Sequence, residues 1–233
     1  MLTLYPSDER GYSHEGWLES RFSFSFAGYR NPAMMGFHHL RVINEDVIQP
    51  GKGFGMHPHH DMEIVTYVIS GALEHRDSIG SGSILYPGRV QAMSAGRGVM
   101  HSEFNPSPVE PVHLLQIWMF PDKQDLAPKY QETEFSRDSK LNRLCLVGSQ
   151  NGRDNSIVIH QKVDLYASVL EYGTRLQHSM PEDHHCWIQV VKGELMVNDT
   201  TVKEGDGLAV LGERELGFEA PIGQCEFLFF DMA

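Results

Sequence analysis

The stretch Gly51–Glu63, which reads GKGFGMHPHHDME, decides how the rest of this 233-residue chain is interpreted. It contains His57-Pro58-His59, and the later stretch His101-Ser102-Glu103 repeats the same alternate spacing of side chains that can bind a metal. On a β-strand, alternate side chains point to the same face, and the backbone rises by about 3.3 Å per residue. Each pair therefore presents its two side chains together. If neighbouring strands carry the two pairs, three imidazoles and one carboxylate meet around one point.

Glycines lie beside both pairs. Gly51, Gly53 and Gly55 precede the first pair, and Gly96 and Gly98 precede the second. Because glycine is common in turns, the segment between the pairs is interpreted as strands joined by turns, which bring the pairs together. The chain has thirteen histidines, so one pair alone is weak evidence. Two pairs beside turn-type backbone predict a metal site.

The amino-acid sequence of these motifs resembles that of the pirin family of bicupins. Residues 51–71 are similar to the first cupin motif, and residues 98–105 are similar to the end of the second. The stretches FGMHPHHDMEIVTYVISG and MSAGRGVMHSEFNPS are similar in sequence to the family, and the similarity covers most of residues 10–120. The resemblance implies an all-β fold, a bicupin with two antiparallel β-sandwich or barrel (cupin) domains.

The resemblance also implies a ligand set. In pirins the metal is held by two histidines of the first motif and by the His and Glu of the HSE triplet, which correspond here to His57, His59, His101 and Glu103. General cupins often use the glutamate of the first motif instead, which is Glu63 in this chain. The spacing alone does not decide which of the two glutamates is the ligand. The match to the HSE triplet of pirins favours Glu103.

The donor set limits which metal we expect. Three imidazoles and one carboxylate suit iron, manganese, cobalt, nickel, copper or zinc, whereas calcium and magnesium prefer sites made of oxygen ligands. We expect one divalent transition metal per chain, with iron(II) ahead of the others. Four protein ligands leave about two open positions on an octahedral ion, which is enough for a substrate atom and dioxygen.

Charge and composition exclude several classes of partner. The formal net charge of −12 argues against a general affinity for DNA, RNA or an anionic membrane. No apolar run approaches the roughly 20 residues that cross a bilayer, and the start, MLTLYPSDERG, lacks the apolar core of a signal peptide. Cys145, Cys186 and Cys225 form no paired motif, so reduced thiols are expected. We therefore expect a cytoplasmic protein. We also expect a monomer.

Strand signals occur in both halves of the chain. Phenylalanine and serine alternate in Phe22–Phe26, which predicts a strand whose phenylalanine face lies in the core. Pro121–Lys140 is polar and contains prolines, which is typical of a linker. We therefore expect an N-terminal metal-binding cupin domain, a linker and a C-terminal cupin-like domain, over residues 1–122, 123–140 and 141–233.

A weak internal repeat relates the two predicted domains. The apolar strand before Gly193 echoes the apolar strand before Gly71, which argues for two related β-sandwiches. Aligning these two glycines puts Ser179 and Pro181 at the positions of the first histidine pair. The C-terminal domain is therefore expected to have no metal site.

Four further side chains are candidates for a substrate pocket. Gln116 and Trp118 share one face of the apolar strand predicted over residues 113–119. A buried glutamine needs hydrogen-bond partners, so Gln116 is either a structural group or a ligand contact, and the pirin resemblance, with its QxW pair, favours the ligand contact. Phe54 lies beside the first motif, and Met93 either reaches the pocket or fills the core.

The resemblance implies an activity that some pirins show, quercetin 2,3-dioxygenase, in which dioxygen opens the central ring of a flavonol and carbon monoxide leaves. The implied partners are a small aromatic substrate and dioxygen, and Glu103 is then both a ligand and the catalytic base that takes the 3-hydroxyl proton. One alternative is a metal- and redox-dependent regulatory protein that acts through protein partners, for which the charge of −12 suits a basic partner. Another is metal-assisted isomerisation or hydrolysis of a small molecule.

Overall fold

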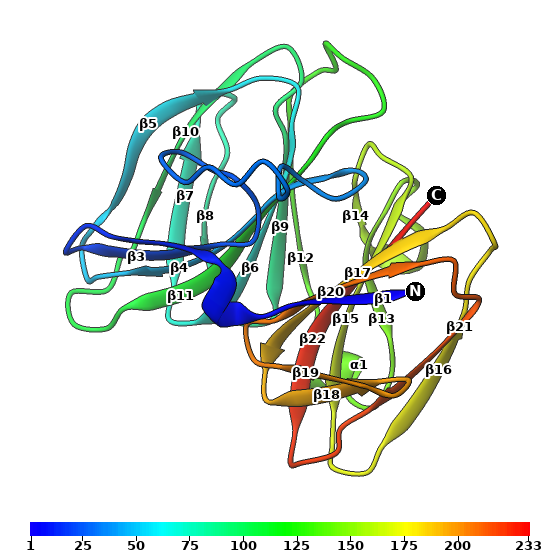
Figure 1. Ribbon diagram of the computed structural model, residues 1–233. Coiled ribbons are helices and arrows are strands. Elements are labelled where there is room, and N and C mark those ends of the chain that lie inside the picture. The colour runs from blue at the N-terminus through cyan, green and yellow to red at the C-terminus, as the bar shows by residue number, and fades with distance from the viewer. The chain divides into compact units, whose positions relative to one another are not determined.

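The computed structural model describes the whole chain, Met1–Ala233, and is built almost entirely of antiparallel β-strands (Figure 1). Its only α-helix is the four-residue α1 (Arg137–Lys140). The chain divides into two compact units, each of which contains two sheets. The N-terminal unit comprises Gly11–Glu134 and Ile157–Gln161, and the C-terminal unit comprises Met1–Arg10, Phe135–Ser156 and Lys162–Ala233.

In the N-terminal unit a seven-stranded sheet, in the order β12-β9-β6-β11-β4-β3-β2, is accompanied by a four-stranded sheet in the order β5-β10-β7-β8. The strand β6 carries an uninterrupted buried run because it lies in the middle of its sheet. The strands span Gly11–His14 (β2), Leu18–Phe22 (β3), Leu40–Ile48 (β4), Gly53–His59 (β5), Glu63–Ser70 (β6), Leu73–Asp77 (β7), Gly82–Leu85 (β8), Arg89–Ser94 (β9), Val99–Phe104 (β10), Val112–Met119 (β11), Lys129–Glu134 (β12) and Ile157–Val158 (β14).

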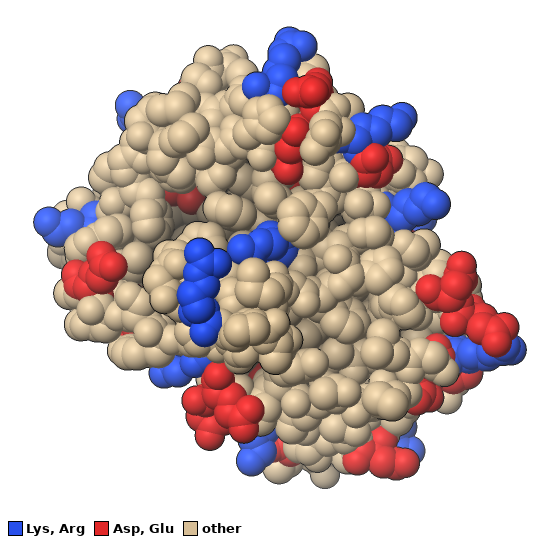
Figure 2. All heavy atoms as spheres, turned by 45° about the horizontal axis from the view of Figure 1, so that its top comes forward, with Lys and Arg blue, Asp and Glu red and all other residues tan.

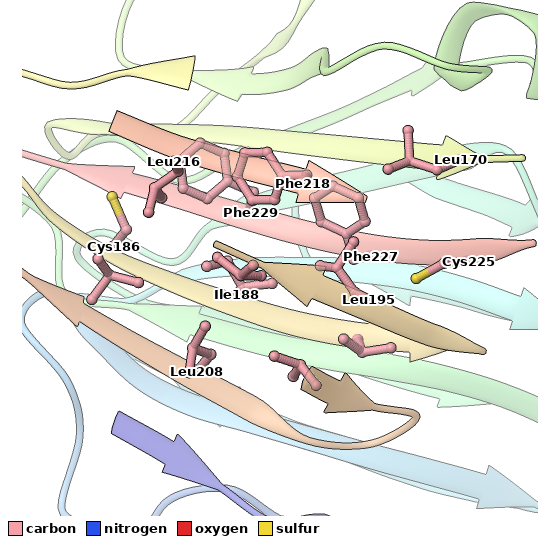
Figure 3. Close-up of a cluster of buried hydrophobic side chains, with 14 of the residues drawn as sticks. Leu170, Cys186, Ile188, Leu195, Leu208, Leu216, Phe218, Cys225, Phe227 and Phe229 are labelled. Carbon is pink, nitrogen blue, oxygen red and sulfur yellow. The ribbon is translucent and has the colours of Figure 1, made fainter. Parts of the chain in front are cut away.

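The C-terminal unit repeats this plan. Its strands in the larger sheet run in the order β1-β20-β17-β22-β15-β13, and its smaller sheet runs in the order β16-β21-β18-β19. An apolar cluster that includes Ile188, Phe218 and Phe229 fills its interior (Figure 3). The strands span Leu2–Tyr5 (β1), Cys145–Ser149 (β13), Val163–Leu170 (β15), Arg175–Ser179 (β16), His185–Lys192 (β17), Glu194–Val197 (β18), Thr200–Lys203 (β19), Gly207–Leu211 (β20), Glu215–Glu219 (β21) and Cys225–Met232 (β22).

The limits of the two units differ from the predicted domain limits, and the segment Ile157–Gln161 of the predicted C-terminal domain belongs to the N-terminal unit. The first strand, β1, pairs with β20, so the start of the chain belongs to the C-terminal unit. The predicted linker contains β12, which pairs with β9 at the edge of the N-terminal sheet. Its sequence, KYQETE, is mostly polar because an edge strand exposes much of its surface, and this composition is also typical of a linker.

The surface in Figure 2 carries lysine and arginine side chains interspersed with aspartate and glutamate, without a continuous basic patch on that face. No helix in the structure has the length and apolar character that a membrane crossing requires.

Candidate metal centre

Three histidines converge on one point between β5 and β10. These strands are paired so that His101 lies opposite His57, and His59 follows two residues later on the same face of β5. The ligand atoms of the three rings all lie within 4.8 Å of one another. Pro58, between the first two, interrupts no ladder because β5 is the edge strand of its sheet. The alternate spacing in the sequence therefore leads to the cluster that it predicts.

The first histidine is held in one orientation by the backbone. The Nδ1 atom of His57 lies 2.8 Å from the carbonyl oxygen of Gly55, which can only accept a hydrogen bond. The proton therefore resides on Nδ1, and the Nε2 lone pair of the ring is available to a metal. The ring of His59 packs edge-on against Trp118, with their centroids 4.8 Å apart. Both rings are thus positioned by groups that do not compete for the metal.

Glu103 lies on β10, two residues after His101, with its side chain buried. A ligand atom of Glu103 lies within 4.8 Å of one of His101. Its Oε2 atom accepts a hydrogen bond of 2.8 Å from Nε2 of Gln116, and Oε1 of Gln116 accepts one of 2.9 Å from the Thr66 hydroxyl. Burial raises the pKa of the Glu103 carboxyl to about 7, against the lowering effect of the bond from Gln116, and the charge of Asp46 raises it further.

Two buried atoms of the centre, Nε2 of His101 and Oε1 of Glu103, have no hydrogen-bond partner. An unpaired buried polar atom costs about 1–3 kcal/mol, so natural proteins rarely leave one without a reason. Burial lowers the pKa of His101 to about 2 and that of His59 to about 4, with the neighbouring imidazoles adding to the shift. These imidazoles are therefore neutral near pH 7 and offer lone pairs. Together with a carboxylate, they fit a divalent transition metal.

A cavity of about 760 Å³ opens beside the four candidate ligands, between the two sheets of the N-terminal unit. Three of the predicted pocket residues, Phe54, Gln116 and Trp118, line it. The residues that line it are Tyr12, Ser13, Glu15, Trp17, Leu18, Ser20, Phe22, Phe26, Ala27, Gly28, Tyr29, Asn44, Asp46, Phe54, His57, His59, His101, Glu103, Gln116 and Trp118.

Met93, the fourth predicted pocket residue, does not line the cavity. It is fully buried in a separate apolar cluster with Ile64, Ala95 and Val99. Trp118 packs against this cluster and also lines the cavity. The larger indole therefore occupies the position facing the cavity, and Met93 fills core, which is the other reading that the sequence left open.

Glu63, the alternative carboxylate ligand, is directed elsewhere. Its Oε1 atom accepts a 2.5 Å hydrogen bond from the Ser94 hydroxyl, and its Oε2 atom accepts a 3.0 Å hydrogen bond from the backbone N–H of His160. Nδ1 of the His160 ring lies 3.1 Å from the same oxygen. Glu63 does not line the cavity. Its carboxylate thus tethers the segment Ile157–Gln161 to the rest of the N-terminal unit.

Sequence reasoning missed much of the cavity wall. The predicted Phe22–Phe26 strand ends at Phe22, and both Phe22 and Phe26 line the cavity, whereas Phe24 is buried in the core. The polar residues Asn44 and Asp46, from β4, line the wall as well. The only signal for these positions is the density of aromatic residues near the start of the chain, because no short motif marks them.

Comparisons with known proteins agree with this architecture. The pirin family model matches residues 6–119, and the model of the quercetinase C-terminal cupin domain matches residues 146–232. The chain is 43% identical over 232 residues to quercetin 2,3-dioxygenase of Escherichia coli (strain K12), covering 100% of this chain and 99% of that protein.

Solved structures give the same result. The structure of YhhW from Escherichia coli matches with a TM-score of 0.96 at 42% identity, covering 100% of this chain and 98% of that one. The bacterial pirin YhhW in complex with nickel(II), also from Escherichia coli, matches with a TM-score of 0.95 at 43% identity, covering 100% and 99%. The predicted all-β bicupin fold is therefore confirmed, and the chain belongs to the pirin family.

Proposed function

We propose that this protein is a quercetin 2,3-dioxygenase, which uses dioxygen to open the central ring of a flavonol and releases carbon monoxide. The proposal is supported by the identity of 43% to the Escherichia coli enzyme of that name over the full length of both chains. The observation that carries it is the position of the three imidazoles and Glu103 beside a cavity large enough for a flat aromatic molecule. Nε2 of His101 and Oε1 of Glu103 are buried there without a hydrogen-bond partner.

His57, His59, His101 and Glu103 are proposed to hold one divalent metal, which when bound supplies the Lewis acidity and the redox chemistry that a reaction with dioxygen requires. We propose iron(II) as the native metal. The related pirin YhhW was solved with nickel(II), so manganese, cobalt, nickel, copper and zinc are the alternatives to be compared.

The cavity wall favours a neutral aromatic ligand with hydroxyl groups. Aromatic rings such as those of Trp17, Phe54 and Trp118 supply apolar contacts, as in most small-ligand sites. No lysine or arginine lines the cavity, whereas the carboxylates of Glu15 and Asp46 do. An anionic ligand would meet repulsion there, while hydroxyl donors find acceptors. A flavonol meets both conditions.

The proposed base is Glu103. Gln116 donates to its Oε2 atom and keeps the carboxylate in one orientation, so that Oε1 is left without a partner. A flavonol 3-hydroxyl placed beside this carboxylate loses its proton to it, and the carboxyl group retains the proton within a buried site. General base assistance of this kind typically contributes about 10²–10⁴-fold to a rate.

The test is Glu103→Gln, which keeps an oxygen and nearly the same shape but removes the base. Wild type and variant are loaded with the same metal to equal occupancy, and loss of flavonol absorbance and release of carbon monoxide are followed. We expect the variant to bind flavonol but to turn over about 10²–10⁴-fold more slowly. The matched control is Glu45→Gln, since Glu45 contacts His113 at 2.9 Å and does not line the cavity. Equal rates for wild type and Glu103→Gln would remove Glu103 from the base role.

The same assay separates the proposed enzyme from a regulatory protein. A chain that acts only through protein partners would release no carbon monoxide with any first-row metal. The monomeric state, the cytoplasmic location and the existence of a protein partner stay predictions from the sequence.

A further inference from the structure

His75 lies next to the candidate metal centre but does not line the cavity. It belongs to β7, which pairs with β10 and brings His75 opposite Glu103. The Nδ1 atom of His75 lies 3.4 Å from the Nδ1 atom of His101, which is a long hydrogen bond. Its Nε2 atom lies 3.2 Å from Oδ2 of Asp77, and both side chains are completely buried. The three side chains thus form a chain of contacts that ends on a candidate metal ligand.

The direction of these hydrogen bonds follows from Asp77, which lies at the far end of the series of contacts. Oδ1 of Asp77 accepts from the backbone N–H groups of Ile79 and Ser81, at 3.0 and 2.9 Å. The carboxylate has no proton to give, so Oδ2 is also an acceptor, and Nε2 of His75 carries the proton between them. Nδ1 of His75 is then the acceptor, and the donor facing it is Nδ1 of His101.

This direction decides which nitrogen of His101 can bind a metal. With the proton of the neutral ring on Nδ1, the lone pair is on Nε2, the atom that is buried without a partner beside the cavity. The ring of His75 has little freedom to turn, because it stacks on Tyr130 with centroids 4.9 Å apart and an angle of 28° between the planes. The hydroxyl of Tyr130 is itself bound to Glu132 at 2.8 Å.

We propose that Asp77 and His75 are positioning residues for the metal centre, which set the tautomer of His101 so that its Nε2 lone pair faces the ion. The backbone carbonyl of Gly55 sets the tautomer of His57 in the same way. Two of the three candidate histidine ligands are thus oriented by hydrogen bonds, one to a side chain and one to the backbone. Partners of this kind are typically worth about 10–100-fold in metal affinity. The inference rests on the proposed metal site but not on the proposed reaction.

The decisive comparison is Asp77→Asn against Asp77→Ala. The amide oxygen of the asparagine will face the N–H groups of Ile79 and Ser81, so its NH₂ group must face His75. That donor reverses the direction of the hydrogen bonds. Nε2 of His75 becomes an acceptor and its Nδ1 becomes the donor to His101. The proton of His101 then moves to Nε2, where it blocks the metal. Alanine removes the carboxylate but imposes no direction.

We expect Asp77→Asn to bind nickel(II) about 10–100-fold more weakly than wild type, and more weakly than Asp77→Ala, in competition with a chelator. A purely structural role for Asp77 predicts the opposite order, because asparagine retains the acceptor for the turn. Heteronuclear NMR of metal-free protein with isotope-labelled histidine should find the proton of His101 on Nδ1 in wild type and on Nε2 in Asp77→Asn. Equal tautomers, or affinity for Asp77→Asn at or above that of Asp77→Ala, would overturn the proposal.

A second pair of variants covers the case in which substitutions of Asp77 prevent folding. His75→Asn keeps an acceptor at the position of Nδ1, whereas His75→Leu does not, so only the asparagine should retain most of the nickel(II) affinity. Equal losses in the two variants contradict the proposed role. Glu45→Gln, which alters a histidine–carboxylate pair away from the cavity, is the matched control and should bind as wild type does. A wild-type chain that binds no nickel(II) would count against the metal site itself, while the tautomer measurement still tests the chain of hydrogen bonds.

Discussion

The two units share one strand order and differ in what fills their interiors. Gly71 and Gly193 relate them: both have positive φ, 78° and 79°, and each directly follows an interior strand of the larger sheet, β6 or β17. A Cβ at either position would lie 2.5 or 2.4 Å from a backbone oxygen, of Pro111 or Gln224 respectively. Only glycine fits such a turn, so the two positions are equivalent.

Counting from these glycines identifies what replaces the metal centre in the C-terminal unit. His75 and Val197 are equivalent, and they lie opposite Glu103 and Phe218 in their respective sheets. Phe218 therefore takes the place of Glu103. By the same register Leu216 replaces His101, and His178, which lies opposite it, replaces His57.

The supporting hydrogen bonds are replaced as well. In the N-terminal unit, Gln91 donates to the Thr66 hydroxyl at 3.3 Å, and that hydroxyl donates to Gln116. The equivalent side chains in the C-terminal unit are all apolar, fully buried and packed in one cluster (Figure 3). They are Leu208, Ile188 and Phe229, as the strand registers give them.

The difference teaches that the cupin framework does not create a metal site by itself. The framework accepts either an apolar interior or a polar one, but a buried carboxylate needs a line of partners that continues from strand to strand. One member of that line, Gln116, both orients Glu103 and lines the cavity. The comparison supports one metal per chain, held in the N-terminal unit.

The largest effect is expected from removing the first histidine pair. His57→Ala combined with His59→Ala deletes two of the three imidazoles, and we expect purified protein to contain no tightly bound metal and to show no turnover. His178→Ala, at the equivalent position of the C-terminal unit, should keep its metal. Elemental analysis checks both. Metal retained by the double variant, or lost from His178→Ala, would break the comparison between the units.

A smaller effect is expected from making the interior of the N-terminal unit apolar at one position. Gln116→Leu leaves Oε2 of Glu103 without its donor, and we expect turnover to fall by about 10–100-fold at matched metal occupancy. The control is Gln189→Leu, since Gln189 is a buried glutamine of the C-terminal unit that donates to the backbone oxygens of Gly205 and Asp206. It should lower the free energy of unfolding and leave turnover unchanged. Equal activities of the two variants would argue against a role for the hydrogen bond to Glu103.

The sequence predicted those parts of the molecule that local pattern encodes. The alternate spacing of His57, His59 and His101 predicted their convergence, and the motif wording predicted the family. The strand β12 was missed because an edge strand can be polar along its length. The pairing of β1 with β20 was missed because it joins segments far apart in the chain without any local signal. His75 was missed because a single histidine in a strand has no distinguishing pattern.

The alignment of the two halves also needed the structure. An alignment without gaps puts Ser179 at the position of His57, whereas the strand register puts His178 there. The segments that join the consecutive strands β5 to β6 and β16 to β17 differ in length, residues 60–62 in one unit and 180–184 in the other, so an alignment without gaps is out of register there. A slip of one residue matters in a strand, because it moves every side chain to the other face.

A stability effect without loss of the metal is expected at Glu63. Glu63→Ala removes the acceptor of the Ser94 hydroxyl and of the backbone N–H of His160, and we expect the free energy of unfolding to fall by about 3 kcal/mol. Denaturant unfolding of the metal-free protein measures this change. Metal content per folded chain should equal that of wild type, and a loss of metal would restore Glu63 as a candidate ligand.

The smallest effect is expected at the group of the C-terminal unit that occupies the place of the histidine cluster. Oδ2 of Asp231 lies 2.8 Å from Nε2 of His178, and its Oδ1 lies 2.6 Å from Nδ1 of His184. Burial alone would raise the pKa of the Asp231 carboxyl, but the hydrogen bonds and charges of the two histidines outweigh it and hold the pKa below its ordinary value. A lowered carboxyl pKa adds stability that is complete above the unfolded-state value of 3.8 and is lost as the pH falls through the folded-state value.

Asp231→Asn keeps the size of the side chain but removes the charge, and we expect it to lower the free energy of unfolding by about 1–2 kcal/mol near neutral pH. Because the contribution comes from the ionised carboxylate, the difference between wild type and variant should shrink as the pH falls below about 4. Denaturant unfolding at a series of pH values measures it. Turnover should be unaffected, since neither histidine lines the cavity. A difference that grows as the pH falls below about 4 has the wrong sign for this group. Loss of metal from Asp231→Asn would mean that the C-terminal unit contributes to the site after all.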